Sequence, residues 1–418
     1  MKLKISRDDL CKALSVVKKS RAFGKIEGEE TIPLLIRATD EDLSFITTNV
    51  GFWSRSKIDK DFFPDEEKVE DVFSIEKAGE FFVDGTHFID HIEKYPKGAM
   101  ITFGEEDRKS GKSLMVSCRN FGKKGRLKST GFVAVKAKYF DEDPPKEERK
   151  EIEVDPIKLI EAAESVEFVA DFRETERHLW GVQLQIFSKE DIASCSANRL
   201  KICWFDKEGY DRKDQKPLAI VIPQRSGLSP VLKTLEKGEV CIFEIGNKYT
   251  IIRQKHQWHA IPNAIQTSKD SMPDWRFLAK KIDNLVKATI KIPRSFLIDC
   301  IKSSNIATGG EFGIRMDFST DEQKVNFSLN AVSDATMIKS FHNETEPLDK
   351  NNIEGEPFND GFVITIDDFG EMLNRCTGEL VTFRINNSRE AVQIVDEEKH
   401  VCLISSVVQG VQANVNHS

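Results

Sequence analysis

A pattern that recurs six times along the chain constrains the fold more than any other feature of the sequence. Each copy is a short alternating strand, a polar turn and an amphipathic helix, as in Lys2–Ile5 leading to Leu10 and Leu14. The anchor positions are Ile5, Val83, Val154, Ile222, Ile292 and Ile366, and successive anchors lie 78, 71, 68, 70 and 74 residues apart. Internal similarity at a near-constant period is the signature of a repeat architecture, but blades and solenoid repeats are shorter, at roughly 20–50 residues.

The copies alternate between strong and weak, which predicts three domains that each contain a doubled helix-and-strand unit of an α+β fold. The strong copies begin at Lys2, Glu151 and Thr289. Further strands are expected after each helix, for example at Met100–Phe103, Leu114–Cys118 and Phe132–Val135. We expect domains at residues 1–140, 151–280 and 288–407, followed by a polar, disordered tail at 408–418. The charged, proline-bearing stretch Tyr139–Lys150 is interpreted as a linker, a second break is placed at Ala279–Lys287, and exposed loops are placed at Asp206–Lys216 and His342–Asp360.

The first helix indicates what the repeated pattern does. Leu10, Leu14 and Val17 fall on one face, whereas Lys12 and Lys19 fall on the other. The apolar face must lie on a sheet, and the lysine face is left to solvent or to a negatively charged partner. A solvated face explains any single helix, but six helices in register favour a shared surface. The helix at residues 156–166 opposes this interpretation, because it presents Glu161 and Glu164.

Composition limits the classes of function. The chain has 418 residues, of which 39% are hydrophobic and 31% charged, as in ordinary globular proteins. The formal net charge of −8 argues against a conventional DNA-binding domain, unless the basic groups are confined to one surface. Neither a signal peptide nor an apolar run of roughly 20 residues is found, so we expect a cytoplasmic protein with no membrane contact. The eight cysteines form no CxxC motif and are expected to be reduced core residues, with no metal site and no cofactor.

Three doubled domains resemble the bacterial DNA sliding clamp, the beta subunit of DNA polymerase III, from Met1 to about Val407. The opening MKLKISRDDLCKAL is similar to the start of that family. Further similar segments are Thr31–Leu35 to T-L-P-I-L, Thr47–Val50 to T-x-T-D-L, Ser194–Leu200 to A-T-D-G-H-R-L and Met272–Arg276 to F-P-D-Y-R, the most specific match. The chain departs from the family at Glu29, at Asn198 and in its last strand, His400–Val407, which precedes a tail. Such departures fit a divergent clamp of a phage or mobile element.

The resemblance implies a ring with helices lining the hole and sheets outside. Two copies would join head to tail as a homodimer that encircles double-stranded DNA without sequence preference and tethers the replicative polymerase after a clamp loader has opened it. A ring holds DNA by topology, so a weak positive lining suffices and an acidic outside keeps it soluble. The residues expected to face DNA are Lys12, Lys19, Arg21, Arg177 and His178, and those expected at the dimer seam are Leu127 and Ile306.

In that family, partner proteins insert a short peptide into an apolar pocket between the second and third domains. Position by position, the resemblance places this pocket at Leu179, Cys195, Leu200, Pro273, Leu278, Val401 and Leu403. Branched and small apolar groups accept a peptide's aliphatic or aromatic anchors. The alternative is that some of these are simply core residues. The tail beyond Val407 follows the last wall of the pocket directly, and we hypothesise that it covers the pocket.

Two other classes of function remain open. Ser110–Ser113 is similar to the end of a phosphate-binding loop, but Glu106 stands where that loop needs glycine. His256 and His259 lie in a strand-like stretch and are expected to be structural rather than metal ligands. We therefore expect no catalytic residues and no enzymatic activity. The remaining alternative is a clamp-fold scaffold or decoy that binds partner peptides without encircling DNA.

Overall fold

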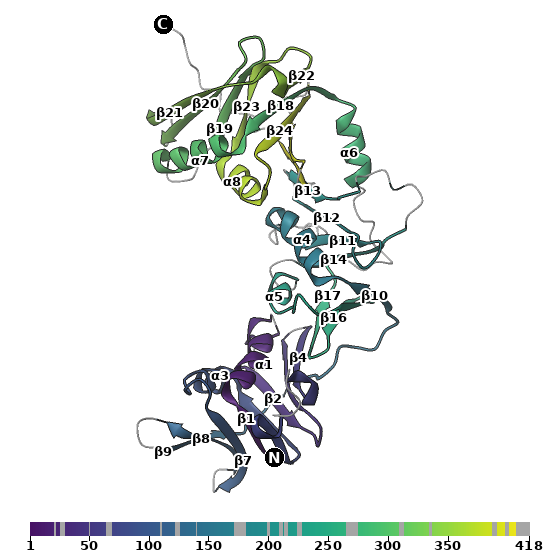
Figure 1. Cartoon of the computed structure of the whole chain (residues 1–418), viewed down its shortest axis with the longest axis vertical. Helices are drawn as coiled ribbons and strands as arrows, with labels where there is room; N and C mark the ends of the chain where they lie inside the picture. The colour runs from purple at the N-terminus through teal and green to yellow at the C-terminus, as the bar shows by residue number, and fades with distance from the viewer. Residues whose placement is uncertain are drawn as a thin grey trace. The chain divides into compact units, whose positions relative to one another are not determined.

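A computed structural model describes most of the chain (Figure 1). The described residues are 1–20, 22–25, 30–49, 51–63, 69–108, 111–121, 126–138, 140–170, 181–198, 201–208, 212, 216–223, 228–264, 275–308, 313–333, 337–386, 391–397 and 401–406. In some strands and helices only the backbone is described. The predicted tail at 408–418 lies outside these residues.

All six anchors lie where a strand gives way to a helix, so the predicted repeat is confirmed. The pairs of elements are β1 (Lys2–Ser6) and α1 (Arg7–Lys19), β6 (Gly79–Asp84) and α3 (Gly85–Glu93), β10 (Lys150–Val154) and α4 (Pro156–Val166), β14 (Leu218–Pro223) and α5 (Ser229–Leu232), β18 (Val286–Pro293) and α7 (Arg294–Thr308), and β23 (Asn359–Thr365) and α8 (Ile366–Arg375). Five anchors lie in the strand, and Ile366 is the first residue of its helix.

Three strands follow each of these helices, which gives the predicted α+β composition. They are β2 (Pro33–Ala38), β3 (Leu43–Asn49) and β4 (Phe52–Ile58); β7 (Met100–Arg108), β8 (Gly111–Phe121) and β9 (Arg126–Val133); β11 (Gly181–Ile186), β12 (Ile192–Ala197) and β13 (Lys201–Phe205); β15 (Cys241–Ile245), β16 (Tyr249–Gln254) and β17 (Gln257–Pro262); β19 (Gly313–Ser319), β20 (Lys324–Ser333) and β21 (Met337–Pro347); and β24 (Leu380–Asn386), β25 (Ala391–Asp396) and β26 (Val401–Ser406). Additional elements are α2 (Val69–Val72), β5 (Phe73–Lys77), α6 (Trp275–Asp283) and β22 (Ile353–Gly355).

The two halves of each doubled unit exchange their first strands. β1 pairs with β7, where Lys4 lies opposite Thr102, and β6 pairs with β2. The same exchange joins β10 to β15 and β14 to β11, and again β18 to β24 and β23 to β19. Each half therefore completes its sheet with a strand from the other half, so neither half can form its sheet alone.

Contacts divide the chain into two units, which are described separately. The first comprises residues 1–158, 188–190 and 222–270, and the second comprises 159–187, 191–221 and 271–418. The first unit holds the sheets β5-β1-β7-β8-β9 and β10-β15-β16-β17-β4-β3-β2-β6, whereas the second holds β14-β11-β12-β13-β26-β25-β24-β18-β22 and β21-β20-β19-β23. This division cuts through residues 151–280, because the long sheets run across the predicted domain boundaries. The three domains therefore stay a prediction.

The helix α1 shows why these residues form these elements. The Ser6 hydroxyl accepts a hydrogen bond from the Asp9 amide at the helix start, and lysines occupy the last turn, where they complement the helix dipole. Leu10, Leu14 and Val17 are buried against the core of the first unit together with Phe45 of β3. Full burial of each such aliphatic side chain contributes about 1.5–3 kcal/mol. The predicted apolar face of this helix is thus confirmed.

One local prediction was wrong. The stretch His342–Asp360 was expected to be a loop, yet β21 extends to Pro347 and β22 and the start of β23 follow. Polar side chains on strands near a sheet edge produced this error. Within Ala279–Lys287, α6 ends at Asp283 and β18 begins at Val286, and the domain break expected there stays a prediction. Of the predicted loop at 206–216, several residues lie outside the described part. In that part, no helix is long and apolar enough to cross a membrane.

Candidate partner-peptide and DNA-facing sites

In the second unit, α6 lies on one face of the nine-stranded sheet. Cys195 of β12 and Cys402 of β26 both lie opposite Trp204 of β13 in the strand register. These three residues form a buried cluster with Trp275 and Ala279 of α6. The rings of Trp204 and Trp275 stack with centroids 5.7 Å apart and planes 25° apart. The helix is therefore held by aromatic packing.

The opposite face of the same sheet is covered by α4. The Ser194 hydroxyl donates to the Ala162 carbonyl of α4 at 2.5 Å, and the Cys203 thiol donates to the Ser165 carbonyl at 3.8 Å. Ser194 alternates with Cys195 along β12, as Cys203 alternates with Trp204 along β13. Because successive side chains of a strand point to opposite faces, the repeat helix α4 and the additional helix α6 cover different faces. Of the predicted pocket positions, Cys195 is therefore on the α6 face, whereas Val401 and Leu403 lie opposite Phe205 and Cys203 and so occupy positions on the α4 face.

A buried carboxylate fixes the start of α6. Asp206 has a side chain that is only 1% exposed, and it accepts a hydrogen bond from Arg276 of α6 at 2.8 Å. Arg212 also pairs with Asp206, and it binds Asp191 at 2.5 Å and 2.9 Å. Both guanidinium groups lie over the Phe187 ring, at 4.0 Å for Arg212 and 5.4 Å for Arg276. Buried charges are tolerated only with such pairing, so this network determines where α6 begins.

The structure brings together only part of the predicted pocket. Cys195 is 3% exposed in the cluster, and Leu278 is half-buried on α6. Val401 and Leu403 lie on β26 opposite Phe205 and Cys203, and only their backbone is described. Leu179, Leu200 and Pro273 lie outside the described residues.

Sequence reasoning missed Cys402, Trp204 and Trp275 as members of this cluster. The described residue of β26 that joins Cys195 is Cys402, between the two predicted positions. The alternation of β13 places Trp204 on the same face as Ile202, and this was the available signal. Burial raises the pKa of the Cys195 and Cys402 thiols, so both are protonated and apolar at neutral pH. They suit an apolar wall rather than a nucleophile.

The residues predicted to face DNA are described only on α1. The Lys12 ammonium lies 2.8 Å from a Glu236 carboxylate oxygen and 4.9 Å from the centroid of the Phe62 ring. Lys19 is exposed, and among the described residues it makes no ion pair. Arg21, Arg177 and His178 lie outside the described residues. The neighbouring Lys18 pairs with Glu93 of α3 at 2.8 Å, so the helix face carries a weak rather than a strong positive charge.

Comparison with solved structures gives matches over nearly the whole chain. The beta subunit of DNA polymerase III from Pseudomonas aeruginosa is 13% identical, has a TM-score of 0.78 and is matched over 98% of this chain and 100% of its own. The DNA polymerase sliding clamp from Bacillus subtilis is 17% identical at 0.77, over 98% and 99%. The beta subunit from Thermotoga maritima is 14% identical at 0.75, over 98% and 99%. This chain has the sliding-clamp fold.

The resemblance inferred from the sequence motifs is thus confirmed for the fold. No model of a protein family and no curated protein matches the sequence. At 12–17% identity, the matches to the clamps show fold alone. The chain therefore shares few local sequence motifs with these clamps, whereas its sixfold strand-and-helix repeat extends over the whole fold.

Each predicted seam residue lies on or beside an edge strand of its own sheet. Leu127 is on β9, the last strand of the five-stranded sheet. Ile306 is on α7, which packs against β21, the last strand of the four-stranded sheet. Only the backbone is described at both positions. Within the described residues, no strand pairs with the outer edge of β9 or β21.

The segment considered above as the end of a phosphate-binding loop leads into a strand rather than a helix. Residues 111–113 open β8, and Gly111, with φ of +114°, turns the hairpin from β7. A phosphate-binding loop instead leads into a helix whose N-terminus faces the phosphate. His259 is structural, as predicted. Its ring nitrogens lie 3.0 Å from Ser54 Oγ and 3.1 Å from Thr234 Oγ1, and burial lowers its pKa to about 3.

Proposed function

We propose that this protein is a DNA polymerase processivity factor: a non-enzymatic, cytoplasmic sliding clamp that encircles double-stranded DNA as a head-to-tail homodimer. The observation that carries the proposal is the position of the strands at the junctions between repeats. In the first unit, β4 pairs with β17, and in the second unit β13 pairs with β26. In both cases the third strand after one repeat helix pairs with the third strand after another repeat helix.

Pairing of third strands in this way leaves two third strands without such a partner among the described residues. The third strands not used within the chain are β9 and β21, and these stand at sheet edges. Exposed edges are a hazard that proteins remove by pairing or covering them. Pairing of β9 in one copy with β21 in another would repeat the junction and, made twice, would close two chains on each other. Leu127 and Ile306 would lie at that seam.

The repeat helices supply the surface proposed to face DNA. Lys12 and Lys19 on α1, with Arg21, Arg177 and His178, would give sequence-independent contacts with phosphates. Such contacts are sensitive to salt, because each phosphate that is neutralised releases counterions. The partial neutralisation of α1 by Glu93 and Glu236 is consistent with a clamp that slides rather than grips.

The cluster under α6 supports the proposed partner site. Cys195, Leu200, Leu278 and their neighbours would accept the apolar anchors of a peptide from the replicative polymerase or the clamp loader, and Leu179 and Pro273 would complete the wall. Val401 and Leu403 are left out of the proposed site, because their positions opposite Phe205 and Cys203 are on the α4 face. The cluster lies on the sheet face away from α4, so a bound partner would leave the helix side free for DNA.

The proposal is tested by imaging and by retention on DNA. Negative-stain class averages should show closed rings with six similar lobes. After incubation with a clamp loader and ATP, the protein should stay on closed circular DNA through gel filtration and should leave when the DNA is linearised. Lys12→Glu combined with Lys19→Glu should reduce retention, whereas Lys77→Glu on β5 serves as the matched control. Crescents that never stay on circular DNA would refute the ring.

A clamp-fold scaffold or decoy is the second candidate function, and the ion pairs of Lys12 and Lys18 on α1 favour it. A decoy would bind partner peptides with the same affinity but would show no retention on circular DNA. The retention assay therefore separates the two functions.

A further inference from the structure

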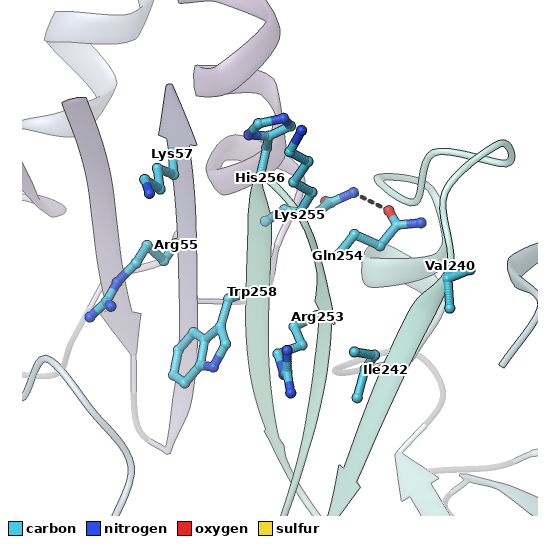
Figure 2. A pocket seen from close by; sticks show the side chains of 10 residues that line it. Arg55, Lys57, Val240, Ile242, Arg253, Gln254, Lys255, His256 and Trp258 are labelled. Atoms are coloured by element: carbon cyan, nitrogen blue, oxygen red, sulfur yellow. Dashed lines mark hydrogen bonds between the residues drawn. The ribbon is translucent and has the colours of Figure 1, made fainter. Parts of the chain in front are cut away.

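The first unit carries a hollow of about 350 Å³ at the end of the sheet where β16 turns into β17 (Figure 2). Four strands and the two turns beside them line it. The charged side chains of the lining are all basic, and Val240, Ile242 and Trp258 supply apolar surface. The full lining is Arg55, Lys57, Val240, Ile242, Arg253, Gln254, Lys255, His256, Gln257 and Trp258. No predicted site residue lies in it.

The sheet register builds this lining in a row. Arg55 lies opposite Trp258, Trp258 opposite Arg253, and Arg253 opposite Ile242. Figure 2 shows these side chains rising from neighbouring strands. The Arg55 guanidinium lies 5.6 Å from the Trp258 ring centroid. Trp258 therefore stands between the positions of Arg55 and Arg253, whose strands are two strand spacings, or about 10 Å, apart.

The same sheet face already binds an acidic segment of this chain, residues 140–149, which contains no helix or strand. Arg37 of β2 donates two hydrogen bonds to Glu142, both 2.7 Å, and Arg55 donates to Asp143 at 3.3 Å. Trp53 Nε1 donates to the Asp141 carbonyl at 2.9 Å. Arg37 and Lys57 both lie opposite Ser44, which places this segment and the hollow on one face of the sheet.

The present partners of the basic groups are partly replaceable. Arg55 pairs with Asp143, Arg253 with Glu151 at 3.5 Å and Lys255 with Asp61 at 3.1 Å. The three carboxylates are each more than 60% exposed. Exposed ion pairs contribute only about 0–1 kcal/mol, so a ligand carboxylate can take the place of one at little cost. The second partner of Arg253, Glu244 at 2.5 Å, holds that side chain in place.

We propose that this hollow binds an acidic, extended peptide segment of a partner protein. Carboxylates of the segment pair with Arg55 and Arg253 while an apolar side chain packs on Trp258 and Ile242. The separation of about 10 Å between strands β4 and β16 matches three residues of extended chain. The site is distinct from the cluster under α6, and it recognises charge where that cluster recognises apolar anchors.

The test uses the full-length protein and a fluorescein-labelled peptide, Asp-Glu-Leu-Asp-Glu-Leu, with its Asn/Gln counterpart as the uncharged probe. We expect fluorescence anisotropy to show binding of the acidic peptide and at least about tenfold weaker binding of the uncharged one. Trp258→Ala and Arg253→Gln should each raise the Kd about tenfold. Lys255→Gln changes an exposed turn residue, and it keeps the test valid if Trp258→Ala does not fold.

Arg37→Gln is the matched control, because Arg37 holds the chain's own acidic segment outside the hollow. It should leave the Kd unchanged within about twofold. The proposal is overturned if the Trp258, Arg253 and Lys255 variants all bind like the wild type, or if only Arg37→Gln weakens binding, since the peptide would then exchange with residues 140–149. If a duplex oligonucleotide displaces the peptide, and this displacement depends on the same three residues, the hollow is a nucleic-acid site. That result would also overturn the proposal.

Discussion

The two junctions between repeats share one strand arrangement but are covered in different ways. At β4–β17 the face away from the helices carries an acidic segment held by Arg37 and Arg55. At β13–β26 it carries a helix, α6, held by the Trp204–Trp275 stack and by Asp206. Exposed charge pairs hold the acidic segment at β4–β17, whereas a buried aromatic contact and a buried carboxylate hold α6 at β13–β26. The covering segment therefore decides what each junction can recognise.

The largest effect should follow the loss of the buried carboxylate. Asp206→Ala leaves Arg212 and Arg276 without their shared partner, and Arg212 is only 4% exposed. Breaking a buried pair in this way costs about 3–5 kcal/mol. Urea unfolding should show this loss, with Asp283→Ala as the control, because Asp283 pairs with Arg384 at a more exposed site. Equal losses for the two variants would contradict the distinction between buried and exposed pairs.

Acid should weaken the first junction through His259. Burial lowers the folded-state pKa to about 3, against 6.5 in the unfolded chain. The contribution of the neutral ring is complete above pH 6.5 and is lost as the pH falls towards 3. Between pH 6.5 and 5 the loss is about 2 kcal/mol. Urea unfolding over this range should show the slope in the wild type and a flatter profile in His259→Gln; parallel profiles would rule His259 out as the cause.

A smaller effect is expected at the acidic segment. Arg37→Gln removes two hydrogen bonds to Glu142, but the two side chains are 32% and 38% exposed. We expect a loss of about 1 kcal/mol that shrinks in high salt. The Arg37 hydrogen bond also lowers the pKa of Glu142, so this contribution is present at neutral pH and is lost in acid. Unfolding at low and high salt checks it, and a loss that does not depend on salt would argue against a charge effect.

The smallest effect is expected from Asp143→Asn. Asp143 is 68% exposed and makes one ion pair, to Arg55. We expect a change in unfolding free energy within about 0.5 kcal/mol. A change as large as that of Asp206→Ala would show that the acidic segment and α6 are held with similar strength. The proposed difference between the two junctions would then be wrong.

Local periodicity was sufficient to predict the repeat. Val83 and Ile292, for example, end alternating strands that lead directly into helices with one apolar face. These signals depend on neighbours within a few residues. They do not show which strand pairs with which, so the exchange of β1 and β6 between halves could not be predicted. Polar residues also hid β21, because a strand near an edge need not alternate clearly.

The candidate site could be predicted only through the family resemblance, and then only in part. A shift of one residue moves a strand position to the other face, and this is why Cys402 rather than Val401 or Leu403 joins the described cluster. The carboxylate that fixes α6 was not predicted, since Asp206 lies 70 residues from Arg276 in the sequence and belongs to no motif. The hollow was missed for a similar reason: its basic residues come from separate strands.

The strand exchange has a consequence for synthesis on the ribosome. Lys4 can pair with Thr102 only after Thr102 has been synthesised, and the same holds for Ile152 with Phe243 and for Ile290 with Phe383. At about 5–20 residues per second, each wait of roughly a hundred residues lasts about 5–20 s. During that time a nascent strand such as Lys150–Val154, which pairs with β15, lacks its partner and exposes Val154, which is fully buried in the folded protein. Translation speed and chaperone capture should therefore govern the yield of this protein in cells.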